Sequence, residues 1–107
     1  MKTHLILPTL ALGIFCSTAA VAGDDITDLV RASGCLSCHS VTEKIVGPAF
    51  QAVSAKYAQD KDAVDMLTQS IKNGQRGKWG RIPMPAHPSL SAAELKQLAT
   101  WVMSHKP

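Results

Sequence analysis

Two cysteines and a histidine lie within five consecutive residues of this 107-residue chain, in the order Cys35-Leu36-Ser37-Cys38-His39. Two thiols three positions apart can each reach one vinyl group of a single porphyrin, and the next residue can present its imidazole to the iron. This C-x-x-C-H spacing is used for covalent attachment of a c-type haem. The motif therefore predicts a fold built around a cofactor that the sequence does not contain.

The same cysteine spacing also occurs in dithiol redox enzymes and in zinc sites. A thioredoxin-like enzyme needs strands that alternate with helices, and no segment after residue 23 has a convincing strand pattern. A structural zinc site needs four ligands, but the only other cysteine is Cys16 and the remaining histidines are scattered. Both alternatives stay open from the spacing, and both lack the further residues that they need.

The first 22 residues have the pattern of a signal peptide. Lys2 precedes an apolar run, residues 5–15, that is too short to span a bilayer, and Ala20-Val21-Ala22 offers the small residues of a cleavage site. Removal would leave one mature domain, residues 23–107, without Cys16. Because c-type haem is attached outside the bacterial cytoplasmic membrane, we expect a periplasmic protein with no stable membrane insertion.

The predicted mature chain is small, about 85 residues, and can bury only a modest fraction of its surface. Chains of this size usually need a stabilising link beyond their side-chain core, which a haem held by covalent and metal bonds would supply. The mature chain has four aromatic residues, Phe50, Tyr57, Trp79 and Trp101. This low aromatic content suits a core in which the porphyrin is the largest ring system.

The first half of the mature chain predicts two helices. Asp24 or Asp25 can cap a helix that ends at Gly34, just before the first cysteine of the motif. Gly47-Pro48 opens a second helix, because proline is favoured near the first helical position and the apolar residues that follow recur at helical spacing.

The second half predicts two more helices with a loop between them. Asp60 is the expected cap of the third helix, which ends at Asn73-Gly74. Residues 74–88 hold three Gly and three Pro, so we expect an irregular but rigid loop. Ser91 forms a capping box with Glu94 at the start of the last helix. The whole pattern predicts an all-α fold of about four helices.

An electron-transfer haem needs a second axial ligand on the far face of the ring, typically a thioether or an imidazole. The mature candidates are Met66, Met84, Met103, His87 and His105. Met66 and Met103 lie within predicted helices, where methionine usually fills the core. Met84 lies between two prolines, which hold its side chain in one direction, and His87 is its main competitor.

Further stretches resemble those of small bacterial class I cytochromes c, the short monohaem group of the periplasm. They are, in family order, Val46-Gly47-Pro48-Ala49-Phe50, Ile71-Lys72-Asn73-Gly74, Trp79-Gly80, Ile82-Pro83-Met84-Pro85 and the terminal helix through Trp101. Together with the haem motif they span nearly the whole mature chain. The resemblance implies the class I cytochrome c fold, with its helices wrapped around one covalently attached haem.

The resemblance also implies the residues that hold the haem. Cys35 and Cys38 form the thioethers, while His39 is the proximal ligand through Nε2 and Met84 is the distal ligand through its sulfur. The iron then has no open position for a substrate, which implies outer-sphere electron transfer without enzymatic activity.

Two further residues are implied to support this site. The Pro48 carbonyl would accept a hydrogen bond from the second ring nitrogen of His39 and so fix its tautomer. The indole N–H of Trp79 would donate to a haem propionate, although ordinary packing also explains a tryptophan at this position.

The chain departs from the family pattern at two positions. Relatives often carry a basic residue, which can pair with a propionate, where this chain has Ser70. They commonly place an asparagine near the methionine sulfur where this chain has His87. This second difference raises the hypothesis that His87 replaces Met84 on the iron at some pH.

The function implied by the resemblance is a soluble, monomeric electron carrier that delivers electrons to a respiratory or denitrifying terminal reductase or oxidase. One alternative is a haem-based sensor or peroxidase-like protein in which Met84 leaves the iron. A haem-free dithiol or zinc protein is another.

The charge pattern suggests where a redox partner docks. The sequence has 11 Lys and Arg against eight Asp and Glu, and two haem propionates would bring the mature charge near zero, so nucleic acid is not an expected partner. No acidic residue lies between Met66 and Ala93, whereas this segment carries Lys72, Arg76, Lys78 and Arg81. These residues indicate either a solvated loop or a basic rim that orients an acidic redox partner.

Overall fold

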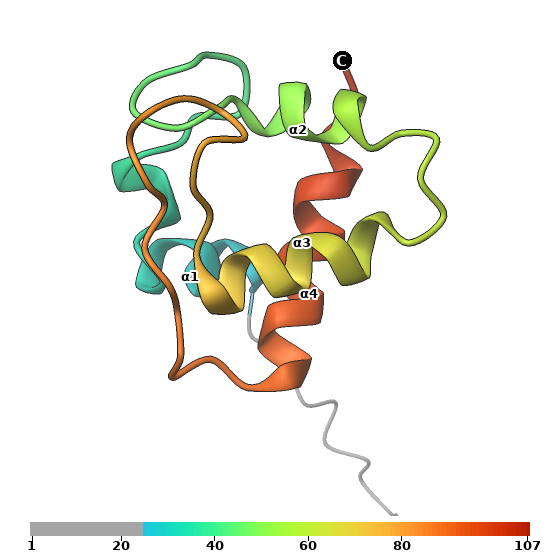
Figure 1. Cartoon of the computed structure of the whole chain (residues 1–107). Helices are drawn as coiled ribbons and strands as arrows, with labels where there is room; N and C mark the ends of the chain where they lie inside the picture. Colours follow the sequence, from blue (N-terminus) through green and yellow to red (C-terminus); the bar gives the residue numbers. More distant parts are fainter. Residues whose placement is uncertain (1–24) are drawn as a thin grey trace, which may run out of the picture.

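The computed structural model describes residues 25–107, so the predicted signal peptide, residues 1–22, lies outside the described part. The elements in chain order (Figure 1) are α1 (Ile26–Ala32), the short 3₁₀ turn η1 (Cys35–Ser37), α2 (Phe50–Lys56), α3 (Ala63–Asn73) and α4 (Ala92–Ser104). Residues 25–107 contain no β-strand, and Gln75 and Met84 form an isolated antiparallel bridge. The predicted all-α fold with four helices is confirmed.

The ends of α1 and α4 follow local signals in the sequence. The Asp25 carboxylate accepts a hydrogen bond from the Thr27 backbone N–H at 3.0 Å, and Gly34 follows the end of α1 with a left-handed φ of 73°. At the start of α4, Ser91 and Glu94 exchange hydrogen bonds of 3.1 and 2.7 Å between side chain and backbone. The predicted capping box is therefore present.

The predicted cap of α3 is wrong by two residues. The helix follows Asp62, whose side chain makes no capping hydrogen bond, rather than Asp60. The Asp60 carbonyl oxygen accepts a hydrogen bond from the Ala63 backbone N–H at 3.2 Å and closes a tight turn ahead of the helix. The predicted end at Gly74 is confirmed, with a φ of 78°.

The start of α2 also differs from the prediction, since the helix begins at Phe50, two residues after Pro48. Its first amide groups have partners outside the helix. Phe50 N–H donates to the Ser40 carbonyl oxygen at 2.9 Å, and Gln51 N–H donates to that of Val41 at 3.0 Å. These bonds tie the start of α2 to the residues directly after the haem motif.

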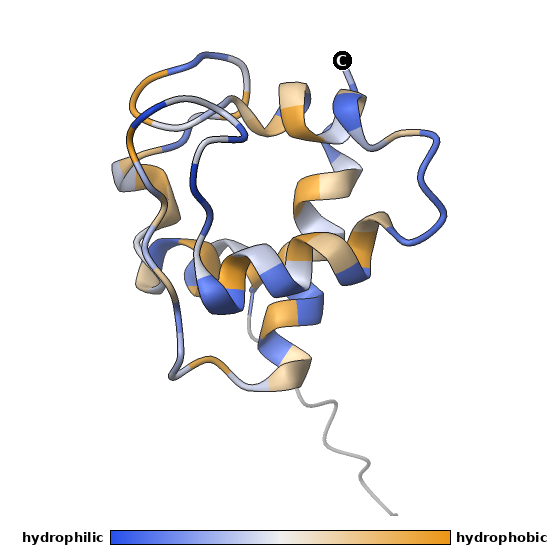
Figure 2. Ribbon diagram, viewed as in Figure 1, coloured by the Kyte–Doolittle hydropathy of each residue, from blue (hydrophilic) through white to orange (hydrophobic). Residues whose placement is uncertain are grey.

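The terminal helix α4 packs against α1, α2 and α3 and holds the fold together (Figure 1). The most buried side chains are Val30 on α1 and Leu98 on α4, and a further cluster of Val53, Tyr57, Ala63, Leu67 and Ala99 joins α2, α3 and α4. Apolar residues recur on these helices, while the connection between α2 and α3 is hydrophilic (Figure 2).

Within residues 25–107, no helix combines the length and the apolar character needed to cross a membrane.

Candidate functional site

The helices and the loop of residues 74–88 surround an apolar cavity of about 320 Å³. Its walls come from the haem motif, from residues 46–53, from α3 and α4, and from the loop. All six site residues named from the sequence line it: Cys35, Cys38, His39, Pro48, Trp79 and Met84. The structure therefore brings together residues that lie up to 49 positions apart.

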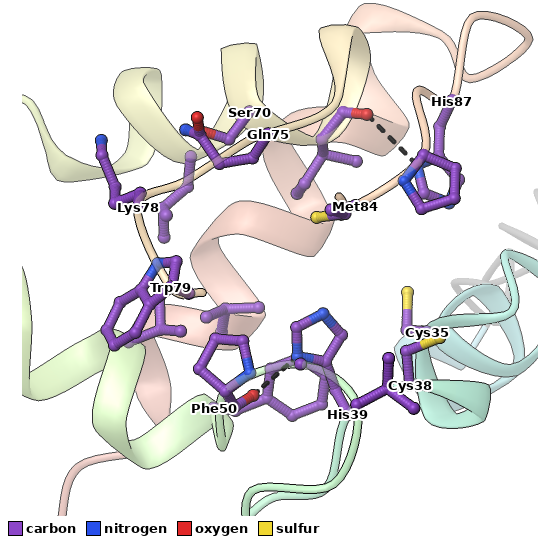
Figure 3. Close-up of a pocket in the computed structure, with 18 of the residues that line it drawn as sticks. Cys35, Cys38, His39, Phe50, Ser70, Gln75, Lys78, Trp79, Met84 and His87 are labelled. Carbon is purple, nitrogen blue, oxygen red and sulfur yellow. Dashed lines mark hydrogen bonds between the residues drawn. The ribbon is translucent and has the colours of Figure 1, made fainter. Parts of the chain in front are cut away.

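Both cysteines of the motif lie at one edge of the cavity, as free and half-buried thiols (Figure 3). The turn η1 places them there, since the backbone N–H groups of Cys38 and His39 both donate to the Cys35 carbonyl oxygen, at 3.2 and 2.9 Å. Burial raises the pKa of the Cys35 thiol. The reactive cysteine of a dithiol redox enzyme needs a lowered pKa, so Cys35 does not fit that chemistry.

The His39 ring is held on three sides. Its Nδ1 lies 2.6 Å from the Pro48 carbonyl oxygen, and its ring stacks on Phe50 with centroids 5.0 Å apart and planes at 21°. A Cβ on Gly47 would lie 2.5 Å from His39 Cε1, so the ring packs against a backbone that has no room for a side chain. Because a carbonyl oxygen only accepts, Nδ1 carries the proton and Nε2 keeps a lone pair.

Met84 reaches the cavity from the opposite wall to His39, with its sulfur directed inward (Figure 3). Its backbone pairs with Gln75, with Met84 N–H donating at 2.9 Å and Gln75 N–H donating at 3.1 Å. The chain returns to this pairing through Gly74, where a Cβ would lie 2.6 Å from the Met84 carbonyl oxygen. The thioether thus comes from a backbone that is fixed against the end of α3.

The other candidate ligands are placed differently. Met66, Met103 and His105 do not line the cavity. Met103 packs against the core cluster, and the His105 ring lies 4.3 Å from the ring of Trp101 between centroids. His87 lines the cavity, but each of its ring nitrogens lies 3.2 Å from a backbone carbonyl oxygen.

Trp79, Ser70 of α3 and Gln75, which follows α3, lie at the end of the cavity away from the cysteines (Figure 3). The Gln75 amide donates to the Ser70 hydroxyl at 3.1 Å, and that hydroxyl donates to the Met66 carbonyl oxygen at 3.1 Å. Lys56 Nζ lies 4.8 Å from the centroid of the Trp79 ring. This end is therefore the polar part of an otherwise apolar site.

Sequence reasoning missed three contributors. Phe50 was named only as an aromatic residue of a family stretch, and Gly47 only as a helix start, although both lie within two residues of Pro48, the His39 hydrogen-bond partner. This closeness in the sequence was the available signal. Gln75 carried no signal, because its contact with Ser70 depends on how the chain turns after α3.

The described residues hold no group of three or more His, Cys, Asp or Glu side chains placed to bind a metal ion. The cavity instead offers two thiols at one edge, an imidazole on one wall and a thioether on the other. A flat apolar macrocycle with a central iron fits this donor set. Covalent bonds at its edge and metal bonds on both faces would match the positions of these four groups.

Several known cytochromes c match this chain over most of its length. The Cytochrome c family profile matches residues 24–106. Cytochrome c-552 of Nitrosomonas europaea is 42% identical over 103 residues, covering 94% of this chain and 100% of that protein. Cytochrome c-551 of Pseudomonas aeruginosa is 42% identical over 106 residues, covering 99% of this chain and 100% of that protein.

A solved structure agrees in fold as well. The crystal structure of wild-type Nitrosomonas europaea cytochrome c552 superposes with a TM-score of 0.72 at 44% identity, covering 75% of this chain and 99% of that chain. The predicted family and fold are therefore confirmed. The chain belongs to the cytochrome c family: it is a class I cytochrome c close to the c-551 and c-552 proteins, an electron carrier rather than an enzyme, with covalently bound haem c.

Proposed function

We propose that this protein carries single electrons between periplasmic partner proteins through a haem c with His39 and Met84 as its axial ligands. The haem supplies the ferric–ferrous couple when bound. One observation carries the proposal: the His39 ring and the Met84 sulfur face one cavity from opposite walls, with Cys35 and Cys38 at its edge (Figure 3). In this arrangement each cysteine forms a thioether.

Axial ligation by two side chains decides the kind of chemistry. If His39 and Met84 both bind the iron, no coordination position would be left for a substrate, which supports outer-sphere transfer. A thioether ligand favours the ferrous state, and apolar cavity walls disfavour the additional charge of the ferric state. We therefore expect a moderately positive reduction potential.

The residues around the ligands tune the site. The Pro48 carbonyl oxygen accepts a hydrogen bond from His39 Nδ1–H, which directs the Nε2 lone pair and makes it a stronger donor. At the polar end, the indole N–H of Trp79 would donate a hydrogen bond to a haem propionate. The Ser70–Gln75 pair on the same side offers neutral hydrogen-bonding groups where relatives often have a cation.

The setting follows from the first 22 residues, which we take as a signal peptide that exports the chain to the periplasm. We propose that the mature protein is a monomer. Its partners are an electron donor and a terminal reductase or oxidase of a respiratory or denitrifying chain.

The docking face for such a partner is the basic segment beside the cavity. Lys72, Arg76, Lys78 and Arg81 are all exposed. Lys78 also lines the cavity, so the segment that carries these cations borders the site of the haem. A basic segment at this position suits a partner with an acidic docking surface.

An oxidised-minus-reduced absorption spectrum of the holoprotein tests the ligation. We expect a c-type haem spectrum and, in the oxidised form, the thioether-to-iron charge-transfer band. Exposure of the reduced protein to carbon monoxide should leave the spectrum unchanged, because both axial positions are filled. A missing charge-transfer band or rapid carbon monoxide binding would instead favour a sensor or peroxidase-like protein with a labile methionine.

A further inference from the structure

We infer that His87 is a positioning residue for Met84, because its ring and backbone tie the loop of residues 74–88 to the ends of both α1 and α3. The inference rests on the proposed function, in which Met84 binds the haem iron. It assigns His87 a task other than coordination.

His87 contacts two helices at once. Its backbone N–H lies 3.1 Å from the Ile71 carbonyl oxygen and 3.2 Å from that of Lys72, both in the last turn of α3. Its ring Nδ1 lies 3.2 Å from the Ile71 oxygen, and Nε2 lies 3.2 Å from the carbonyl oxygen of Ser33, which caps the end of α1. Figure 3 shows this ring beside Met84.

The nature of these partners explains why a histidine suits the position. The last carbonyl groups of a helix have no partner within the helix and carry a partial negative charge. Since a carbonyl oxygen only accepts, a ring contact is a hydrogen bond when the facing nitrogen carries a proton. The neutral ring therefore donates to one of the two oxygens, through the nitrogen that carries the proton.

The contact with Ser33 joins two sides of the cavity. Ser33 lies two residues before Cys35, at the edge where the thioethers form. Among the hydrogen bonds of residues 25–107, this contact is the one that links the loop of residues 74–88 to α1 and the haem motif. The Gln75–Met84 bridge and the Ile71 contacts hold the loop to the α3 side alone.

His87 and Met84 lie close together along the chain, so the position of one backbone restricts the other. Only Pro85 and Ala86 separate the two residues, and proline restricts its own φ to about −65°. A displacement of the His87 backbone therefore also displaces the Met84 backbone. Removing the ring should free the methionine relative to the cysteine edge and let the Gln75–Met84 pairing open more often.

Ligand exchange by His87, the hypothesis drawn from the sequence, gives the opposite expectation. If His87 replaced Met84 at alkaline pH, its removal would preserve methionine ligation to higher pH. If His87 holds the loop, its removal weakens that ligation, and the thioether-to-iron charge-transfer band is lost at lower pH. The direction of this shift distinguishes the two.

The test compares His87→Phe and His87→Asn with the wild-type holoprotein. Phenylalanine keeps a ring without donors, whereas asparagine keeps an N–H donor. His105→Phe is the matched control, because His105 Nδ1 also contacts a helix carbonyl oxygen, that of Trp101 at 2.8 Å, and does not line the cavity. The charged groups on the helices that His87 contacts are unchanged in all variants: Asp28 and Arg31 on α1, and Asp65 and Lys72 on α3.

Two measurements are made on each variant. Hydrogen exchange of the Met84 and Gln75 amides in the reduced protein reports loop opening, and a pH titration of the charge-transfer band in the oxidised protein reports ligation. For His87→Phe we expect exchange faster by roughly tenfold and loss of the band at lower pH. For His87→Asn, the exchange rate and the pH at which the band is lost should lie between those of His87→Phe and the wild type. His105→Phe should leave the exchange of both amides unchanged.

Unchanged amide exchange in His87→Phe would overturn the inference, as would a band that persists to higher pH, which would assign His87 to ligand exchange. Should His87→Phe fail to fold, a rate for His87→Asn equal to that of the wild type would also overturn it. Absence of the band from the wild type would refute Met84 ligation and therefore the proposed function. The amide exchange would still report whether His87 holds the loop.

Discussion

His39 shows how closely single residues specify this site. The Pro48 carbonyl orients the ring, Phe50 stacks on one face of it, and Gly47 leaves space where any side chain would collide. Phe50 in turn contacts Trp101 of α4 edge to face, with ring centroids 5.0 Å apart. The orientation of one imidazole is thus connected to the packing of the terminal helix.

Replacing Gly47 by alanine should displace the His39 ring. Because the new Cβ would lie 2.5 Å from Cε1, the ring or the backbone must move, which costs about 1–3 kcal/mol of unfolding free energy. Denaturant unfolding and the reduction potential of the holoprotein measure this effect. Thr42→Ala, at an exposed residue of the same loop that does not line the cavity, is the control and should change stability little. Wild-type stability and potential in Gly47→Ala would show that the ring is not closely packed there.

At the scale of the elements, the ends of the helices position the residues of the site. The amide groups at the start of α2 bind carbonyl oxygens directly after the haem motif, and the end of α3 turns through Gly74 into the pairing of Gln75 with Met84. The left-handed φ at Gly74 and the close approach of the Met84 carbonyl oxygen both require glycine. The end of α3 therefore determines where the thioether lies.

Gly74→Ala should disturb the methionine more than the chain as a whole. At the φ of 78° and ψ of 173° of Gly74, a residue other than glycine costs about 1–3 kcal/mol, and here the Cβ would also collide with the Met84 carbonyl oxygen. We expect a weaker thioether-to-iron charge-transfer band and a lower potential. Gly77→Ala is the matched control, because its φ of 74° is similar but its Cβ would meet nothing within 4 Å. Equal spectra for the two variants would contradict the prediction.

The cap of α1 should give the protein a pH-dependent contribution to stability. Hydrogen bonds from Thr27 hold the pKa of Asp25 below its usual range, and Arg31 adds to this effect. A carboxyl group with a lowered folded pKa stabilises the protein above its unfolded pKa of about 3.9, and the contribution is lost as the pH falls through the folded value. Unfolding measured from neutral to acid pH should show this loss in the wild type. Asp25→Asn keeps the cap without titrating, so identical pH profiles would refute the role.

At the scale of the whole molecule, the cavity and the basic segment lie next to one another. Gly77, Lys78, Trp79 and Gly80 line the cavity, so the segment that carries the cations also forms its wall. Lys78 Nζ lies 5.5 Å from the centroid of the Tyr57 ring, which holds this cation near the wall. A partner docked on the basic segment would therefore lie close to the haem.

Neutralising two of these cations should slow electron transfer to an acidic redox protein. We expect the double variant Lys72→Gln, Lys78→Gln to react about tenfold more slowly at low salt and to show a weaker dependence on ionic strength. Stopped-flow kinetics over a range of salt concentrations measure both. The control is Lys61→Gln, Lys96→Gln, which removes the same charge from exposed residues outside the segment. Equal rates for the two double variants would show that net charge alone matters.

Much of the fold was predictable because its signals are local. The Ser91–Glu94 capping box and the glycine ends of α1 and α3 depend on residues within one helical turn, and the structure has all of them. The starts of α2 and α3 were misjudged for a physical reason. The start of α2 is decided by backbone hydrogen bonds to another segment, such as that from Phe50 N–H to the Ser40 carbonyl oxygen, which no propensity encodes. The start of α3 is shifted by the turn that the Ala63 N–H closes on the Asp60 carbonyl oxygen.

By itself, the sequence determined the cysteine–histidine motif, the helical class and the family, because these depend on residue types at short spacing along the chain. Only the tertiary structure decided that Met84 and His87 line the cavity while Met66 and Met103 do not, and that the His87 ring lies between the ends of two helices. These placements arise from contacts between residues far apart in the chain. They exist only once α1, α3 and the loop have packed around α4.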